Sequence, residues 1–128
     1  MRAKSVTSER STVKRVYVEL CRQQRLPFPQ DYGELAAPSK PGVYVIRKGE
    51  VVLHVGRTLR GNKGLHQRLK NHLYGSSSFT KKYLKGNGAV LRKGHNYQFL
   101  VVYDPRLRAL LEAYTLGLLC PKHIGLGE

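Results

Sequence analysis

The feature that most constrains the fold is a pair of short β-rich runs separated by three residues that suit a turn. Residues 42–47 and 51–56 are dominated by valine with isoleucine, leucine and tyrosine, and Lys48-Gly49-Glu50 joins them. Such side chains favour pleated strands, and a glycine-bearing link of this length is typical of a hairpin. The sequence therefore predicts an antiparallel β-hairpin.

Helices and one further strand are predicted around this hairpin. Ser11 is a candidate N-cap, because apolar residues then recur at steps of three and four, as a helix with one buried stripe requires. The predicted elements are a helix from Ser11, an irregular connector at 27–41, a helix at 65–74, a short basic helix at 79–86, a strand at 97–103 and a helix at about 105–119.

These elements predict a small α/β or α+β layer structure, in which helices flank a three-stranded antiparallel sheet. A chain of 128 residues with 41% hydrophobic content can bury one core and is too short for two. We expect residues 1–40 to form an N-terminal helical extension with its connector, and residues 41–128 to form the main domain.

The charge of the chain points to a polyanionic partner. Lysine and arginine number 23 against 8 acidic residues, which gives a formal net charge of +15. Solubility alone needs only a few net charges, whereas neutralising phosphates uses many. DNA is the expected partner and RNA is a second candidate, since phosphate recognition alone does not distinguish the two sugars.

The sequence also suggests a compartment. Cys21 and Cys120 lie far apart and in no metal-ligand spacing, so neither a disulfide framework nor a zinc site is predicted. The first ten residues lack the apolar core of a secretory signal, and no apolar stretch approaches the length of a membrane span. We therefore expect a soluble cytoplasmic protein without a membrane partner. The oligomeric state is left open, and a partner protein is compatible with so small a chain.

Four motifs carry a resemblance to a known family. They are Gly-Val-Tyr at 42–44, His-Val-Gly at 54–56, Arg68 with His72 four residues later, and Glu112 nine residues before Pro121. In this order and spacing the chain resembles the GIY-YIG nuclease family over about residues 42–121. The resemblance implies a GIY-YIG-like domain at 41–128 that hydrolyses DNA phosphodiester bonds with Mg²⁺ or Mn²⁺.

The candidate catalytic residues are Tyr44, His54, Arg68, His72 and Glu112. By resemblance, Tyr44 orients or deprotonates the attacking water, while His54 stands where the family more often has tyrosine. Histidine can also accept a proton, so the sequence leaves open which of the two does so. Arg68 is expected to clamp the scissile phosphate, because a guanidinium can hold two oxygens at once, and His72 lies on the same helical face as a helper.

Glu112 is the candidate metal ligand, because a hard divalent ion prefers oxygen and can be held by one protein carboxylate. The alternative is a surface salt bridge to Arg108, four residues earlier on the helix. The expected phosphate and DNA contacts are Arg57, Arg60, Lys63 and Lys70.

Two departures from the family pattern support a second interpretation. One is His54, and the other is His123, which stands shortly after Pro121 where the family often has asparagine. The chain could keep the fold as a catalytically inactive module that binds DNA or RNA.

Overall fold

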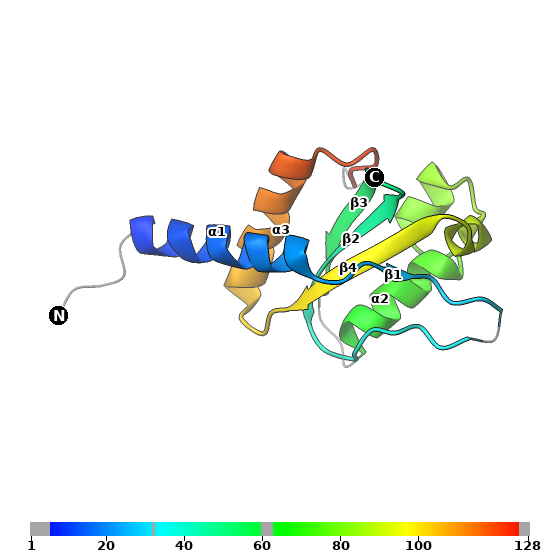
Figure 1. Ribbon diagram of the computed structural model, residues 1–128, viewed down its shortest axis with the longest axis horizontal. Coiled ribbons are helices and arrows are strands. Elements are labelled where there is room, and N and C mark those ends of the chain that lie inside the picture. Colours follow the sequence, from blue (N-terminus) through cyan, green and yellow to red (C-terminus); the bar gives the residue numbers. More distant parts are fainter. Residues whose placement is uncertain (1–5, 32, 60–62, 126–128) are drawn as a thin grey trace.

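The computed structural model describes residues 6–31, 33–59 and 63–125 of the chain. Its centre is an antiparallel sheet of four strands in the order β1-β4-β2-β3. The strands are β1 (Leu26–Pro27), β2 (Gly42–Lys48), β3 (Val51–Arg57) and β4 (His95–Val101). The helices α1 (Val6–Arg22) and α3 (Pro105–Leu119) lie on one face, and α2 (Gly64–Leu73) lies on the other (Figure 1). In the described part of the chain, none of the helices has the length and apolar character needed to cross a membrane.

The predicted hairpin is present as β2 and β3. Gly49 adopts a φ of +58°, which a turn residue without a side chain reaches at little cost. Tyr44 lies opposite Gly56 and Ile46 lies opposite His54, before the register shifts between Ile46 and Arg47. Because directly opposed residues project from the same face of a sheet, Tyr44 and His54 both face α2.

The sheet has four strands, so the prediction of three was wrong. The additional strand β1 lies at the start of the predicted connector, with Leu26 opposite Tyr97 of β4. A strand of two residues, one of them proline, is too short to leave a periodic pattern in the sequence.

The predicted start of the first helix was also wrong. The helix α1 begins at Val6, so Ser11 lies inside it. The first turns of α1 make contacts with distant parts of the chain, which sequence patterns do not predict. One of them is the ion pair of Glu9 with Arg106 of α3, at 2.7 Å.

The predicted basic helix at 79–86 takes a different form. Phe79–Tyr83 makes one π-helical turn, η1, and Gly88–Arg92 forms a 3₁₀ helix, η2, that the sequence patterns did not predict. Both short helices lie on the α2 side of the sheet, as their contacts with α2 indicate (Figure 1).

The central strand β2 is buried from both sides, which places a core on each face of the sheet. The core that faces α2 includes Tyr44, Ile46, Leu53, Leu65, Leu69, Leu73, Phe79, Leu91 and Tyr97. The core that faces α1 and α3 includes Val16, Leu20, Val43, Val45, Val55, Val102 and Leu111. Both cores fix the hairpin rigidly between helices.

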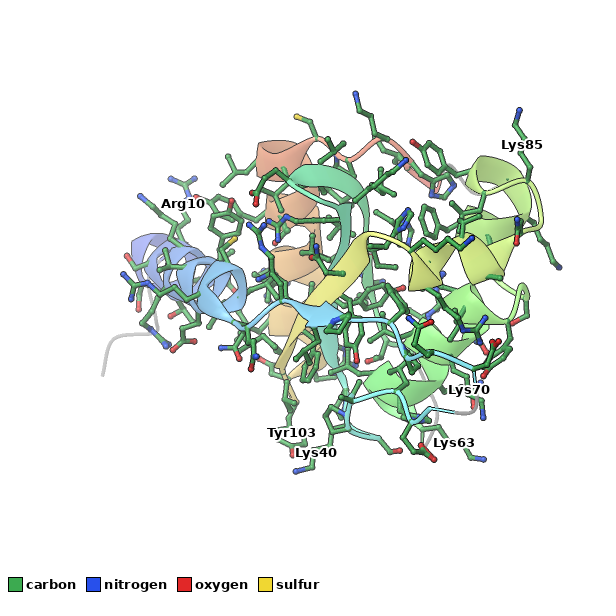
Figure 2. The ribbon with its side chains drawn as sticks, turned by 45° about the vertical axis from the view of Figure 1, so that its right-hand side comes forward. Arg10, Lys40, Lys63, Lys70, Lys85 and Tyr103 are labelled. Atoms are coloured by element: carbon green, nitrogen blue, oxygen red, sulfur yellow. The ribbon has the colours of Figure 1, made fainter. Side chains whose placement is uncertain are left out.

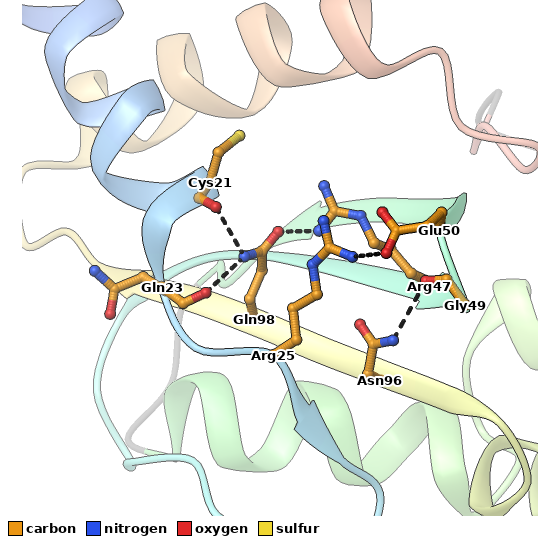
Figure 3. Close-up of polar contacts among 8 residues, drawn as sticks. All are labelled: Cys21, Gln23, Arg25, Arg47, Gly49, Glu50, Asn96 and Gln98. Carbon is orange, nitrogen blue, oxygen red and sulfur yellow. Dashed lines mark hydrogen bonds and ion pairs between the residues drawn. The ribbon is translucent and has the colours of Figure 1, made fainter.

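A buried polar contact ties α1 to the sheet. Arg47, just past the register shift, is 5% exposed, and its guanidinium donates to the side-chain oxygen of Gln98 (Figure 3). The Gln98 amide donates in turn to the carbonyls of Cys21 and Gln23, at 3.4 and 3.0 Å, where α1 ends. Exposed Arg25 pairs nearby with Glu50 at 2.9 Å.

Candidate active site

Tyr44 lies in the middle of β2, and its hydroxyl meets a histidine of α2. Tyr44 Oη and His72 Nε2 are 2.6 Å apart, and both side chains are buried. Gly56 lies opposite Tyr44, and a Cβ at that position would overlap the phenol. The glycine that ends the His-Val-Gly segment therefore makes room for the tyrosine of the Gly-Val-Tyr segment.

His72 continues into a chain of hydrogen bonds. Its Nδ1 lies 2.6 Å from Ser77 Oγ, the Ser77 hydroxyl donates to Thr80 Oγ1 at 3.1 Å, and the Thr80 hydroxyl donates to the His72 carbonyl. Since each hydroxyl has one proton, this order makes His72 Nδ1–H a donor to Ser77 and leaves Nε2 to accept from Tyr44. Neither Ser77 nor Thr80 is predicted as a site residue from the sequence, because a serine run signals only a break in a helix.

Burial keeps Tyr44 and His72 uncharged. It raises the pKa of the Tyr44 phenol to about 12, and the charge and a hydrogen bond of Arg68 oppose that rise. Burial also lowers the pKa of His72 well below its ordinary value, and the nearby charges of His54 and Arg68 act in the same direction. Tyr44 is thus a neutral donor and His72 a neutral acceptor near pH 7.

His54 of β3 lies among other rings in the same cluster. Its ring centroid is 6.0 Å from that of Tyr44 and 4.9 Å from that of His72, and it stacks on Phe79 at 4.6 Å. His54 Nδ1 is 3.1 Å from His123 Nδ1. Burial first, and then the charges of His123 and Arg68, lower the pKa of His54 to about 3, so the imidazole is neutral at pH 7.

The segment after α3 brings His123 to this position. The backbone N–H groups of Lys122 and His123 donate to the carbonyls of Val52 and Leu53, at 3.1 and 2.8 Å. The segment therefore runs along the outer edge of β3. The residue that stands in place of the family's asparagine thus lies within the cluster.

Three partly exposed charged residues, Arg57, Arg68 and Glu112, lie beside the buried rings. Arg57 at the end of β3 pairs with Glu112 of α3, with 3.1 Å between the guanidinium and the carboxylate. Burial raises the pKa of Glu112, whereas Arg57 and then Arg68 lower it, so both cations act on this acid. The charge of Arg68 also acts to lower the pKa of Tyr44, and the Arg68 Nε is buried without a hydrogen-bond partner in the described part of the chain.

Arg108, the alternative partner of Glu112, is engaged elsewhere. Its guanidinium donates to the backbone carbonyls of Thr58, Val102 and Tyr103, at 3.2, 2.9 and 3.2 Å. These bonds fasten α3 to the ends of β3 and β4. The ion pair of Glu112 is made with Arg57 instead.

The structure thus brings together Tyr44, His54, Arg57, Arg68, His72 and Glu112, whereas Lys63 and Lys70 lie outside this group (Figure 2). Lys63 and Lys70 are exposed at the periphery of the molecule (Figure 2). Lys70 lines a small pocket with Glu34 and His66, on the side of α2 that faces the 27–41 segment. Arg60 lies outside the described residues.

The residues present fit a hard divalent cation held by a single protein carboxylate. Over 6–31, 33–59 and 63–125, there is no group of three or more histidine, cysteine or acidic residues that could hold a metal. Mg²⁺ commonly takes only one or two carboxylates and fills its other positions with water and substrate phosphate. Glu112, whose side chain is 23% exposed, has the required chemistry and access.

Comparison with known proteins places this site in a known fold. No protein-family model and no curated protein matches the sequence significantly. Among solved structures, the magnesium-bound GIY-YIG N-terminal endonuclease domain of UvrC from Thermotoga maritima matches with a TM-score of 0.52 and 23% identity, over 70% of this chain and 89% of that one. A mutant of bacteriophage T4 EndoII matches with a TM-score of 0.53 and 16% identity, over 88% and 98% respectively. The chain has a GIY-YIG-like fold.

Proposed function

We propose that the protein is a divalent-metal-dependent endonuclease that hydrolyses phosphodiester bonds in DNA. The observation that carries this proposal is the 2.6 Å contact of Tyr44 with His72, beside Arg68 and Glu112. Metal-assisted hydrolysis needs a group that activates water, a cation for the phosphate and a ligand for the metal. The likeness in fold to a UvrC domain that binds magnesium as its catalytic cation supports the same reading.

The proton of the attacking water passes to Tyr44 in this mechanism. As Tyr44 Oη takes that proton, it releases its own to the Nε2 lone pair of His72, which Ser77 holds in the required tautomer. His54 is the weaker candidate for the acceptor, because its Nδ1 faces His123 rather than a group that could pass the proton on toward Ser77.

Arg68 binds the scissile phosphate and at the same time uncovers Tyr44. The Tyr44 side chain is 0% exposed in the free protein, and Arg68 lies near enough for its charge to lower the pKa of the phenol. A phosphodiester that draws the guanidinium away opens access to the Tyr44 hydroxyl. Glu112 is the residue that would hold the divalent ion, which when bound stabilises the charge that develops on the phosphoryl and leaving oxygens.

The test is a cleavage assay on supercoiled plasmid, branched duplex and single-stranded DNA, with EDTA, Mg²⁺ or Mn²⁺. We expect cleavage only with a divalent ion, and Glu112→Gln and Arg68→Ala should each lower the rate by about a hundredfold or more. Both should still shift DNA in a gel. Arg25→Gln is the matched control, because it removes a positive charge from an exposed ion pair with Glu50. If Glu112→Gln and Arg68→Ala cut as fast as the parent, the site assignment is wrong.

Two observations favour a second candidate function, a basic module that binds DNA or RNA without cutting it. The Tyr44 hydroxyl is fully buried, and the Glu112 carboxylate is paired with Arg57. Binding without cleavage across both metals, several pH values and all three DNA substrates would support this module over the enzyme. Competition between DNA and RNA of matched length then identifies its ligand.

A further inference from the structure

The ion pair between Arg57 and Glu112 joins the end of one strand to the middle of a helix. Arg57 is the last residue of β3, Glu112 lies within α3, and their charged groups are 3.1 Å apart. The side chains are 33% and 23% exposed, so the pair is partly shielded from water and stronger than one at the open surface. Arg108 donates to backbone carbonyls, so among the described residues it is Arg57 that forms the ion pair with Glu112.

This pair lies where the proposed function needs a divalent cation. A guanidinium and a metal ion are both positive, so they compete for one carboxylate and repel each other at short range. Arg68 adds a second positive charge whose effect also reaches Glu112. In the free protein, the Glu112 carboxylate proposed as the metal ligand is therefore already paired with Arg57, and Arg68 is a second cation near it.

Arg57 borders an open groove into which its side chain can rotate. Arg57 also lines an open groove of about 690 Å³ together with Thr58, Leu59, Pro105, Arg108 and Ala109. Two arginines border this groove, so a phosphate of a nucleic-acid strand lying in it would attract the guanidinium of Arg57. Rotation toward the groove would free the Glu112 carboxylate.

We propose that Arg57 keeps Glu112 closed to the metal until a DNA phosphate takes over its guanidinium, so that DNA and the divalent ion bind cooperatively. The inference rests on the proposed function and adds a regulatory role for one residue of that site. By thermodynamic linkage, DNA must raise the affinity for the metal by the same factor as the metal raises the affinity for DNA. Hydrolysis is thus coupled to the presence of substrate, and the free protein holds little metal.

The first test measures Mn²⁺ binding to the full chain without DNA, by the loss of the free-ion signal in electron paramagnetic resonance. We expect Arg57→Gln to bind Mn²⁺ roughly tenfold more tightly than the parent, which corresponds to about 1.4 kcal/mol. Arg25→Gln removes the same charge from the ion pair with Glu50 and controls for the change in net charge. Glu112→Gln should lose the site, and Arg57→Lys, which keeps the charge, should stay near the parent.

The second test repeats the titration with a short duplex, in proteins that also carry Tyr44→Phe and with the DNA checked on a gel for integrity. DNA should tighten Mn²⁺ binding strongly when Arg57 is present and much less in Arg57→Gln. Arg57→Met serves as a second neutral variant, and thermal unfolding confirms that each variant is folded.

The outcomes separate this inference from the proposed function. If Mn²⁺ binding depends on Glu112 but folded Arg57→Gln and Arg57→Met bind it no more tightly than Arg25→Gln, the role of Arg57 is overturned while the proposed function stands. If Glu112→Gln binds Mn²⁺ as the parent does, the metal ligand is wrong, and the proposed function and this inference fall together.

Discussion

At the scale of single residues, the hydrogen-bond partners distinguish two buried side chains that the sequence leaves equivalent. Tyr44 and His54 lie on the same face of the hairpin and both have a suitable functional group for proton transfer. Tyr44 meets an imidazole lone pair on His72, whereas His54 Nδ1 faces His123, which is 69 residues away in the chain. A contact across such a separation leaves no local pattern, so the sequence could not assign the acceptor.

Replacing each of these residues in turn tests the assignment. Tyr44→Phe removes the hydroxyl that meets His72 and should lower the rate of DNA cleavage by about 10²–10⁴-fold, the range of general acid–base effects. His54→Gln should lower it much less. Single-turnover rates at saturating Mg²⁺ measure both effects. A larger loss for His54→Gln than for Tyr44→Phe would transfer the role of acceptor to His54.

The pKa of His54 also predicts how stability depends on pH. His54 titrates at about 3 in the folded protein and at its ordinary 6.5 when unfolded, so below pH 6.5 only the unfolded chain takes up this proton. The free energy of unfolding is therefore unaffected by His54 above pH 6.5 and falls as the pH drops from 6.5 toward about 3, where the folded protein also takes up the proton. His72 acts in the same direction.

Urea unfolding from about pH 8 to about pH 5 measures this dependence. The variant His54→Gln cannot titrate at this position, so its unfolding free energy should decline less steeply below pH 6.5 than that of the parent. Parallel declines in the two proteins would contradict the buried, neutral state of His54.

At the scale of elements, the sequence patterns predicted the helices and strands that depend on residues close together in the chain. The hairpin, α2 and α3 follow from apolar spacing and a glycine turn. In the structure Asp104 also caps α3, because its side chain accepts from Arg106 N–H at 3.2 Å. The strand β1 and the start of α1 involve contacts with distant segments, β4 and α3 respectively, which local patterns do not reveal. At the site, the motif names Tyr44 and Glu112 as candidates whose roles stay predictions, whereas the Arg57–Glu112 pair spans 55 residues and was not predicted.

The close approach of β3 to Tyr44 yields a prediction for Gly56. A methyl group there would overlap the Tyr44 hydroxyl, so Gly56→Ala should destabilise the fold by about 1–3 kcal/mol and displace Tyr44 from His72. Thermal unfolding and cleavage assays measure the two effects. Gly117→Ala is the matched control, because Gly117 is exposed in α3 with open space around it, and it should be neutral or stabilising by up to about 1 kcal/mol. Equal effects at both glycines would contradict this view of Gly56.

At the scale of the whole molecule, the net charge of +15 is distributed over several surfaces. Lys63 lies at the start of α2, next to the loop that follows Arg57, whereas Lys70 lines a pocket with Glu34 and His66 beside the 27–41 segment. The charge therefore promotes encounter with DNA in general, and only some of these residues are placed to follow a strand bound at the site.

Salt dependence separates the two kinds of lysine. Each phosphate contact contributes about 0.9 to the slope of log affinity against log salt for duplex DNA. Lys63→Gln should reduce that slope by about this amount, and Lys70→Gln should leave it nearly unchanged. Fluorescence anisotropy with a labelled duplex over a range of KCl concentrations measures both. A reduced slope for Lys70→Gln would place the DNA on the far side of α2 as well.

The segment that carries His123 to the cluster also has a consequence for solubility. A sheet has two outer strands whose unpaired backbone groups can recruit another molecule and start aggregation. At one edge, β1 is only two residues long and contains Pro27; at the other, the N–H groups of Lys122 and His123 bond to β3. The segment that carries His123 into the cluster thus also occupies the carbonyls of Val52 and Leu53, so that a neighbouring molecule cannot bond to β3 at these two positions.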